Sequence, residues 1–254
     1  MNHQDHPLNG NIVEVRDAKA SSSVVVICEH ASAYIPAEFD NLGLADEMLL
    51  SHVVWDPGAM SLAEEIAERL DATLIAAKTS RLVYDCNRPP RAPDAIPARS
   101  EVVDVPGNAN LSADQKAERV KAYYEPFHTA VAEIIAGIEN PILVTVHSFT
   151  PIFHGNLRDV EIGILHDSDS RLADALLSTS SANTPRNVRR NEPYGPTDGV
   201  THTLKEHALP QGLLNVMLEV RNDLIASEAE QIAMAKMMSK WLESALAITG
   251  TKPC

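Results

Sequence analysis

Cysteines and aromatic residues are scarce in this sequence, and long apolar runs are missing. The three cysteines form no Cys-x-x-Cys pair and leave an odd number, which favours reduced thiols over a disulfide framework. No stretch approaches the ~18 consecutive apolar residues of a membrane span. The polar N-terminus also lacks the apolar segment of a signal peptide. We therefore expect a cytoplasmic protein with no membrane partner.

Positive charge is scarce as well. The 254 residues include 21 Lys and Arg against 35 Asp and Glu, which gives a formal net charge of −14. This balance disfavours nucleic acid or an anionic membrane as the main partner. A small anionic substrate remains compatible with it, because a site can be locally basic on an acidic protein. The composition predicts no particular oligomeric state.

Several common functional motifs are absent. The sequence has no GxGxxG, no GxxxxGK[ST] loop, no GxSxG elbow and no HExxH. Nucleotide binding and serine-hydrolase chemistry therefore have little support.

Short apolar runs alternate with segments of helical periodicity along most of the chain. The runs are typical of strands buried on both faces, and the periodic segments predict helices. The expected strands are residues 24–28, 73–77, 142–146, 160–165 and 214–220, with shorter ones at 82–84 and 152–154. The expected helices are residues 45–52, 59–70, 112–138, 170–178, 200–208 and 227–245. This alternation predicts a three-layer α/β/α sandwich around a mostly parallel or mixed sheet. We expect a flexible leader over residues 1–22 and a single domain over residues 23–254.

Polar side chains follow three of the expected strands at the point where each one ends. Glu29 and His30 end the first, His147 ends the central one, and Glu219 lies near the end of the last. In open α/β sheets, functional residues gather at the carboxyl ends of the strands. A histidine in such a place can also be structural, bonded to a backbone carbonyl.

Two histidines and a carboxylate would satisfy a catalytic zinc site, which takes three N or O ligands and keeps one position open. His30 and His147 are the expected imidazole ligands. Asp56, in the turn WDPGA, is one candidate for the third, although Asp before Pro-Gly is also ordinary turn chemistry. Glu29 is the competing candidate. Neighbours on an extended strand point to opposite faces, so Glu29 and His30 would share a metal only if the backbone were irregular there.

Glu219 is a charged residue in an otherwise apolar strand, so it needs a partner or a function. One hypothesis is an ion pair with Arg221. The other is a general base that takes a proton from water at the metal and passes it to a leaving nitrogen.

Arginines near strand ends are candidates for binding a carboxylate, because the guanidinium fork matches that group. The candidates are Arg81, Arg88 and Arg221, and Asn87 would add an amide hydrogen bond. Tyr194, in the loop NEPYGP, is a candidate for closing over the substrate. We interpret six further histidines as structural: His52, His128, His154, His166, His202 and His207.

Several segments together resemble the N-formylglutamate amidohydrolase family. They are VVVICEHAS with the following Ile-Pro, WDPGA, SRLVYDCNRP, the His-Ser pair, NEPYGP and LEVRND, and they extend from Val24 to Asp223. The family resembles the zinc carboxypeptidases more distantly, which implies a carboxypeptidase-like fold. The first ligand motif departs from the carboxypeptidase His-x-x-Glu, because Ala33 stands where the glutamate would be. Asp56 is the replacement that the resemblance implies, since the family has an acid at that turn.

The resemblance implies a zinc-dependent hydrolase that cleaves the amide bond of an N-acyl amino acid, with N-formyl-L-glutamate giving formate and glutamate. Zinc would be held by His30, Asp56 and His147, with Glu219 as base and then acid. Asn87 and Arg88 would hold the α-carboxylate, with Arg81 or Arg221 at the oxyanion or a second carboxylate. Two alternatives remain open. One is an amidase or carboxypeptidase of different specificity, and the other is a non-catalytic carboxylate-binding relative.

Overall fold

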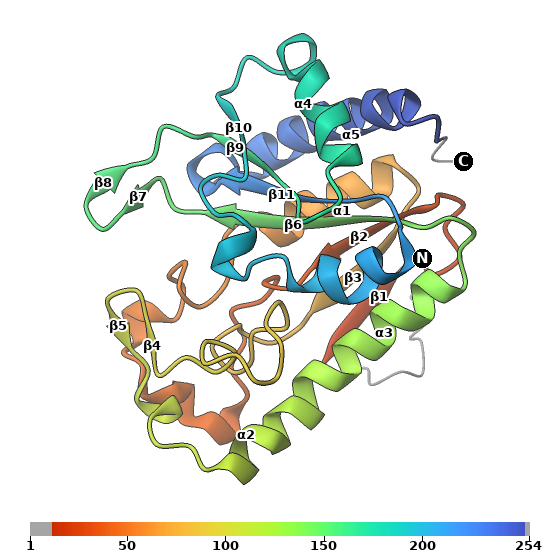
Figure 1. The fold of residues 1–254 in the computed structure, drawn as a ribbon. Coiled ribbons are helices and arrows are strands. Elements are labelled where there is room, and N and C mark those ends of the chain that lie inside the picture. Colours follow the sequence, from red (N-terminus) through yellow and green to blue (C-terminus); the bar gives the residue numbers. More distant parts are fainter. Residues whose placement is uncertain (1–11, 252–254) are drawn as a thin grey trace.

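A mixed seven-stranded sheet forms the centre of the computed structural model, which describes residues 12–251 (Figure 1). The strand order is β1-β3-β2-β6-β11-β9-β10. The four strands β3, β2, β6 and β11 run parallel, whereas β1 and β9 each pair antiparallel with their inner neighbour. The strands of this sheet are β1 (Val13–Arg16), β2 (Val24–Cys28), β3 (Thr73–Ala77), β6 (Ile142–Phe149), β9 (Ile162–Leu165), β10 (Val188–Arg190) and β11 (Asn215–Arg221).

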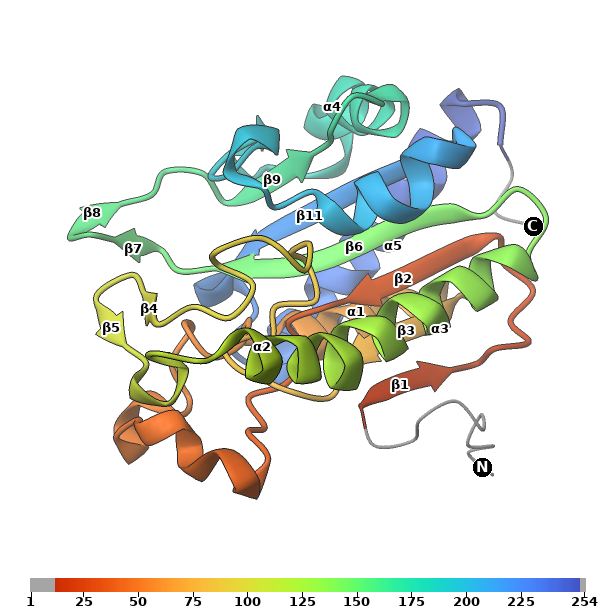
Figure 2. The ribbon, with the colours of Figure 1, turned by 60° about the horizontal axis from the view of Figure 1, so that its bottom comes forward.

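Helices cover both faces of the sheet, which confirms the predicted three-layer α/β/α architecture. One apolar core lies between the sheet and α1, α4 and α5, and the other lies between the sheet and α3. Figure 2 shows α2 and α3 in front of β2 and β3, with α1 and α5 behind them. The helices are α1 (Ala59–Arg69), α2 (Ala113–Arg119), α3 (Glu125–Ala136), α4 (Arg171–Asn183) and α5 (Glu228–Ile248). Within residues 12–251, no helix is long and apolar enough to cross a membrane.

Helix starts follow the sequence closely. Ser112 and Ser227 each accept a hydrogen bond from the backbone of the third helical residue, and the side chain of that residue bonds back to the serine N–H. These capping boxes satisfy backbone donors that a helix would otherwise leave unpaired. The helix that begins after Ser112 continues through a π-helical turn, Val120–Tyr124, into α3. A second π-helical turn, Leu204–Ala208, lies in the predicted helix at 200–208.

The prediction of a flexible leader is wrong for residues 13–16. These residues form β1, which pairs antiparallel with β3 and covers that edge of the sheet. VEVR alternates apolar and polar residues as a strand does, but the run is only four residues long and lies between polar segments, so its pattern is a weak signal. Residues 1–11 of the predicted leader lie outside the described residues, and residues 17–22 form turns and bends before β2.

Two other predicted elements differ. Residues 82–84 are buried but form a turn, because the backbone N–H of Val83 bonds to the carbonyl of Ser80 and no strand pairs with them. The predicted helix at 45–52 is reduced to one 3₁₀ turn, Asp46–Met48.

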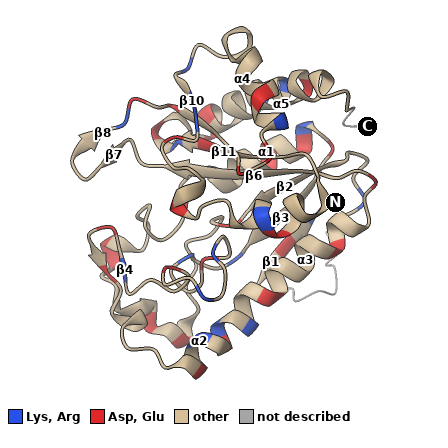
Figure 3. Ribbon diagram, viewed as in Figure 1, with Lys and Arg blue, Asp and Glu red and all other residues tan. Residues whose placement is uncertain are grey.

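Two small hairpins project beyond the carboxyl ends of the central strands. They are β4 (Arg99–Ser100) with β5 (Val103–Asp104), and β7 (Ile152–Phe153) with β8 (Asn156–Leu157), and β7 corresponds to the short strand predicted at 152–154. Charged residues lie mainly on helices and loops, and the middle of the sheet is almost free of them (Figure 3). The charged side chains that are buried at the strand ends therefore require a partner or a function.

Candidate metal centre and the surrounding cavity

A cavity of about 900 Å³ lies at the carboxyl ends of β6 and β11. The hairpin β7–β8 and the loop that contains Tyr194 contribute to its walls. Its lining includes most of the side chains predicted from the sequence: His30, Asp56, Arg81, Asn87, Arg88, His147, Tyr194 and Glu219.

The register of three neighbouring strands brings three of the buried polar side chains into one row. In the parallel pair β6–β11, Glu219 lies directly beside His147. The pair β2–β6 sets Ile27 beside Thr145, and the same register continued by two residues sets Glu29 beside His147. Because side chains two residues apart point to the same face, all three project toward the α3 side of the sheet. Each is at most 5% exposed.

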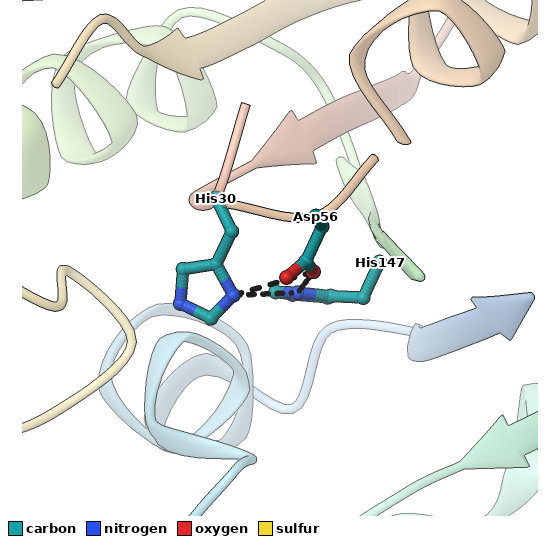
Figure 4. A group of neighbouring side chains, drawn as sticks. All are labelled: His30, Asp56 and His147. Carbon is teal, nitrogen blue, oxygen red and sulfur yellow. Dashed lines mark hydrogen bonds and ion pairs between the residues drawn. The ribbon is translucent and has the colours of Figure 1, made fainter. Parts of the chain in front are cut away.

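His30, Asp56 and His147 converge at the centre of the site (Figure 4). His30 comes from the turn after β2, Asp56 from the turn before α1, and His147 from β6 itself. The Nδ1 atoms of the two histidines are 3.2 Å apart, and Asp56 Oδ2 lies 3.3 Å from His30 Nδ1 and 2.9 Å from His147 Nδ1. All three side chains are buried.

Each histidine has a carboxylate behind it, on the ring nitrogen that faces away from this centre. Asp85 Oδ1 lies 2.7 Å from His30 Nε2, and Glu29 Oε2 lies 3.0 Å from His147 Nε2. A carboxylate on the outer nitrogen orients a ligating histidine and leaves its inner nitrogen free to bind a metal. Glu29, the rival third ligand, therefore lies behind His147, and Asp56 completes the group.

Arg81 joins the two aspartates of the site. Its Nη1 lies 3.4 Å from Asp56 Oδ1 and its Nη2 lies 2.9 Å from Asp85 Oδ2. Burial alone would raise the pKa of Asp85, but the nearby His30 and Arg81 outweigh burial and hold it well below its usual value. Both aspartates are thus kept ionised, which is the state needed to bind a cation.

The residues present fit a divalent metal of the zinc type. Nitrogen and oxygen donors about 2.0–2.1 Å from a tetrahedral ion are roughly 3.3 Å from one another. The three separations in this group, 2.9, 3.2 and 3.3 Å, lie close to that value. Two imidazoles and one carboxylate form the donor set of a catalytic zinc site, with a position left for a further ligand.

Glu219 is the buried carboxylate that remains unpaired. Its Oε2 has no hydrogen-bond partner among the described residues. Burial raises the pKa of Glu219 to about 7, with His147 opposing the shift and Asp56 adding to it. The alternative of an ion pair with Arg221 does not occur, because Arg221 pairs with Asp223 at 2.8 Å. A carboxyl that gains and loses a proton near neutral pH suits a general base.

Asn87 and Arg88 line the cavity, but the protein already uses much of their hydrogen-bonding capacity. The Asn87 amide donates to the Val200 carbonyl and accepts from Thr203, so it ties down the segment that follows Gly199. Arg88 donates through Nε to Asp94 and through Nη1 to two backbone carbonyls. Its Nη2 has no partner within residues 12–251, so this nitrogen is the one available to a substrate.

Arg221 does not line the cavity, so its predicted contact with substrate has no geometric support. Besides Asp223, its Nη1 donates to the backbone carbonyl of Arg158 at 3.0 Å. Arg158 itself lines the cavity and donates to the Tyr194 hydroxyl at 3.0 Å. Sequence reasoning missed Arg158, because it follows a hairpin in a polar segment that has no strand-end pattern.

The loop that contains Tyr194 packs closely against β9. Gly163 of β9 pairs with Glu219, and a Cβ atom at Gly163 would lie 2.1 Å from the Glu192 carbonyl oxygen. Only glycine therefore allows the loop to approach the sheet beside Glu219.

A second group of histidines lies buried between the two π-helical turns. His128 Nε2 lies 2.8 Å from the Cys86 carbonyl and its Nδ1 lies 2.6 Å from His207 Nε2, while the Tyr124 hydroxyl lies 2.9 Å from His202 Nε2. These contacts agree with the structural interpretation of the three histidines. We call His128, His202 and His207 the second histidine cluster.

The comparisons with known proteins agree with this geometry. Residues 22–226 match the model of the N-formylglutamate amidohydrolase family. The gene product Atu2144 of Agrobacterium tumefaciens is similar at 52% identity and a TM-score of 0.92, over 94% of this chain and 96% of that one. An N-formylglutamate amidohydrolase from Ralstonia eutropha has the same fold at 19% identity and a TM-score of 0.63, over 94% and 97% of the two chains. No curated protein matches significantly.

The fold, the site and the family match together define a hydrolase that acts on carbon–nitrogen amide bonds. The chain belongs to the N-formylglutamate amidohydrolase family.

Proposed function

We propose that the protein is a metal-dependent amidohydrolase that cleaves an N-acyl amino acid, with N-formyl-L-glutamate as the substrate and formate and L-glutamate as the products. The observation that carries the proposal is the convergence of His30, Asp56 and His147 beside an unpaired Glu219. The family match supports the amide substrate.

His30, Asp56 and His147 would hold a zinc ion through Nδ1, Oδ2 and Nδ1. When bound, the ion supplies a Lewis acid that polarises the acyl carbonyl and lowers the pKa of water to about 7. Asp85 and Glu29 keep the two imidazoles oriented for this task.

Glu219 accepts a proton from the attacking water and later gives it to the leaving nitrogen, so that the amide breaks into a carboxylic acid and a free amine. Its position beside His147 puts this carboxyl next to the metal centre. The Arg88 Nη2 group binds the α-carboxylate of the substrate, and Asn87 fixes the segment beside it. Arg81, between Asp56 and Asp85, supplies positive charge near the oxygen on which negative charge develops.

The direct test is hydrolysis of N-formyl-L-glutamate by protein that has been depleted of metal and then reloaded with zinc. We expect activity to disappear with the metal and to return with it. Glu219→Gln should lower kcat by on the order of 10²–10⁴, whereas Glu133→Gln, an exposed change on α3, should not. Activity that is indifferent to metal removal, or full activity in Glu219→Gln, would overturn the proposal.

Two rival functions can be separated by simple measurements. A panel of N-acyl amino acids distinguishes a relative of different specificity. A non-catalytic carboxylate-binding protein was expected to pair Glu219 with Arg221, and the Arg221–Asp223 pair counts against it. A cytoplasmic location remains a prediction.

A further inference from the structure

Four arginines line the cavity, and they differ in how their charge is balanced. Arg81 contacts Asp56 and Asp85, and Arg88 contacts Asp94. Arg158 and Arg189 have no carboxylate partner within residues 12–251. Two of the four arginines therefore have no carboxylate at ion-pair distance in the described part of the chain, although Glu101, Asp159, Glu192 and Asp198 also line the cavity.

Arg158 is held by groups that leave its charge in place. Its guanidinium lies over three aromatic rings, 4.3 Å from the centre of Phe153, 4.9 Å from Tyr194 and 5.5 Å from Phe149. Its Nη2 donates to the Tyr194 hydroxyl at 3.0 Å and its Nη1 to the Thr150 carbonyl at 3.3 Å. Ring faces and neutral acceptors orient a guanidinium plane without cancelling its charge.

The backbone of Arg158 is fixed as firmly as its side chain. The Arg158 N–H donates to the Pro151 carbonyl at 2.8 Å, and Arg221 Nη1 donates to the Arg158 carbonyl at 3.0 Å. Arg221 is fixed in turn by Asp223. Arg221, predicted to bind substrate directly, thus supports the residue that lines the cavity in its place.

Tyr194 links Arg158 to the catalytic end of the cavity. Burial raises the pKa of Tyr194; Glu219 adds to this shift, whereas Arg158 and Arg81 oppose it, so both ends of the cavity lie within electrostatic reach of its ring. Arg88, the residue assigned to the α-carboxylate, comes from a different loop. A ligand held at Arg88 and at the metal centre therefore has a second, separate cationic group within the same cavity.

We propose that Arg158 is the specificity-determining residue that binds a second carboxylate on the substrate, so that N-acyl derivatives of acidic amino acids are preferred over neutral ones. This inference rests on the proposed function of the site. Arg189 is the competing group, but it is exposed, and within residues 12–251 no ring or hydrogen bond holds its side chain.

The experiment compares kcat/KM for N-formyl-L-glutamate and N-formyl-L-glutamine, which have nearly the same shape and differ in the side-chain charge. We expect the zinc-loaded wild type to favour the glutamate compound by roughly 10- to 100-fold, the range of a charged hydrogen-bonded contact. Arg158→Gln should bring the ratio close to one by slowing only the glutamate compound. Arg158→Lys should give an intermediate ratio, because it keeps the charge and loses the planar stacking.

A matched control is Arg186→Gln, which removes the same charge from a residue that pairs with Glu161 outside the cavity lining. It should leave the ratio unchanged. Equal slowing of both compounds in Arg158→Gln would show a purely structural role and overturn the inference. Loss of discrimination in Arg189→Gln with discrimination kept in Arg158→Gln would also overturn it.

Failure of the proposed function is recognised separately. If the zinc-loaded protein hydrolyses no N-formyl amino acid, the proposed function fails, and calorimetric binding of the same two compounds then decides the inference. Tighter binding of the glutamate compound that is lost in Arg158→Gln supports the role of Arg158, and equal binding of both compounds overturns it.

Discussion

The protein buries two groups of histidines on the same side of its sheet, and only one of the two groups is surrounded by carboxylates. The group at the candidate metal centre, His30 and His147, is enclosed by Glu29, Asp56 and Asp85. The second histidine cluster contacts one backbone carbonyl and a tyrosine, and two of its rings contact each other. Both groups are buried, so burial alone does not distinguish them.

The carboxylates determine what each group can bind. Burial disfavours the charged form of His147, but Glu29 and Asp56 outweigh it and raise the pKa of His147 well above its usual value. Burial and neighbouring imidazoles lower the pKa of His128 to about 3, and burial lowers the pKa of His207 to about 4. The metal centre therefore attracts positive charge, whereas the second histidine cluster excludes it.

Replacing one histidine of each group with asparagine should give the largest difference, measured as zinc affinity. His147→Asn removes one of the three proposed ligands, so zinc affinity should fall by more than the roughly 100-fold expected for an outer residue. His207→Asn, the matched change in the second histidine cluster, should keep the zinc affinity of the wild type. Zinc titration by calorimetry measures both. Equal affinities in the two variants would contradict the assignment of the metal centre.

Removing a carboxylate behind a ligand should have a smaller effect. Asp85→Asn takes the charge from the outer nitrogen of His30 and should weaken zinc binding by roughly 10- to 100-fold. Asp94→Asn is the control, because Asp94 lies in the same loop and pairs with Arg88 instead. The same titration measures the difference, and unchanged affinity in Asp85→Asn would argue against a supporting role.

The second histidine cluster should make the protein sensitive to acid. The folded pKa values of His128 and His207 lie below the usual value near 6.5, so the unfolded chain binds more protons as the pH falls. The stability contributed by these two neutral histidines is then fully present above about pH 6.5 and is lost progressively as the pH falls toward their folded pKa values, about 3 for His128 and about 4 for His207. Urea unfolding at pH 7, 6 and 5 should show a shallower decline in His207→Gln. His154→Gln, a change on an exposed loop, should decline as steeply as the wild type.

The smallest expected effect concerns a single hydrogen bond of the second histidine cluster. Tyr124→Phe removes the hydroxyl that contacts His202 and should lower the free energy of unfolding by roughly 0.5–1.5 kcal/mol. Tyr34→Phe, at a residue 59% exposed, should change it by less than about 0.5 kcal/mol. A Tyr124→Phe variant as stable as the wild type would show that the hydroxyl contributes nothing.

The sequence predicted much of the sheet and of its row of polar residues, because both depend on local pattern. Apolar runs predicted the strands. His147 and Glu219 were recognised as candidates because they are polar residues at the ends of these runs. Strand geometry argued against Glu29 and His30 binding the same metal, and in the structure Glu29 contacts the outer nitrogen of His147.

The residues that were missed depend on tertiary contacts. Asp85 reaches His30 across 55 positions of the chain, from a loop with no periodic pattern. Arg158 lines the cavity because it follows the short hairpin β7–β8. Arg221 pairs with Asp223 and does not line the cavity. Edge strand β1 depends on its pairing with β3 more than on its own hydrophobicity. Contacts between residues far apart in the chain produce no local sequence pattern from which they could be predicted.

The close packing at Gly163 determines how near the loop that contains Tyr194 lies to the sheet. This loop can lie close to β9 because Gly163 has no Cβ atom to collide with the Glu192 carbonyl oxygen. A larger residue at position 163 would push the loop that contains Tyr194 away from the sheet. None of the proposed zinc ligands, their supporting carboxylates or Arg88 would be changed. The shape of the cavity can thus change through Gly163, which is not among the residues that line it.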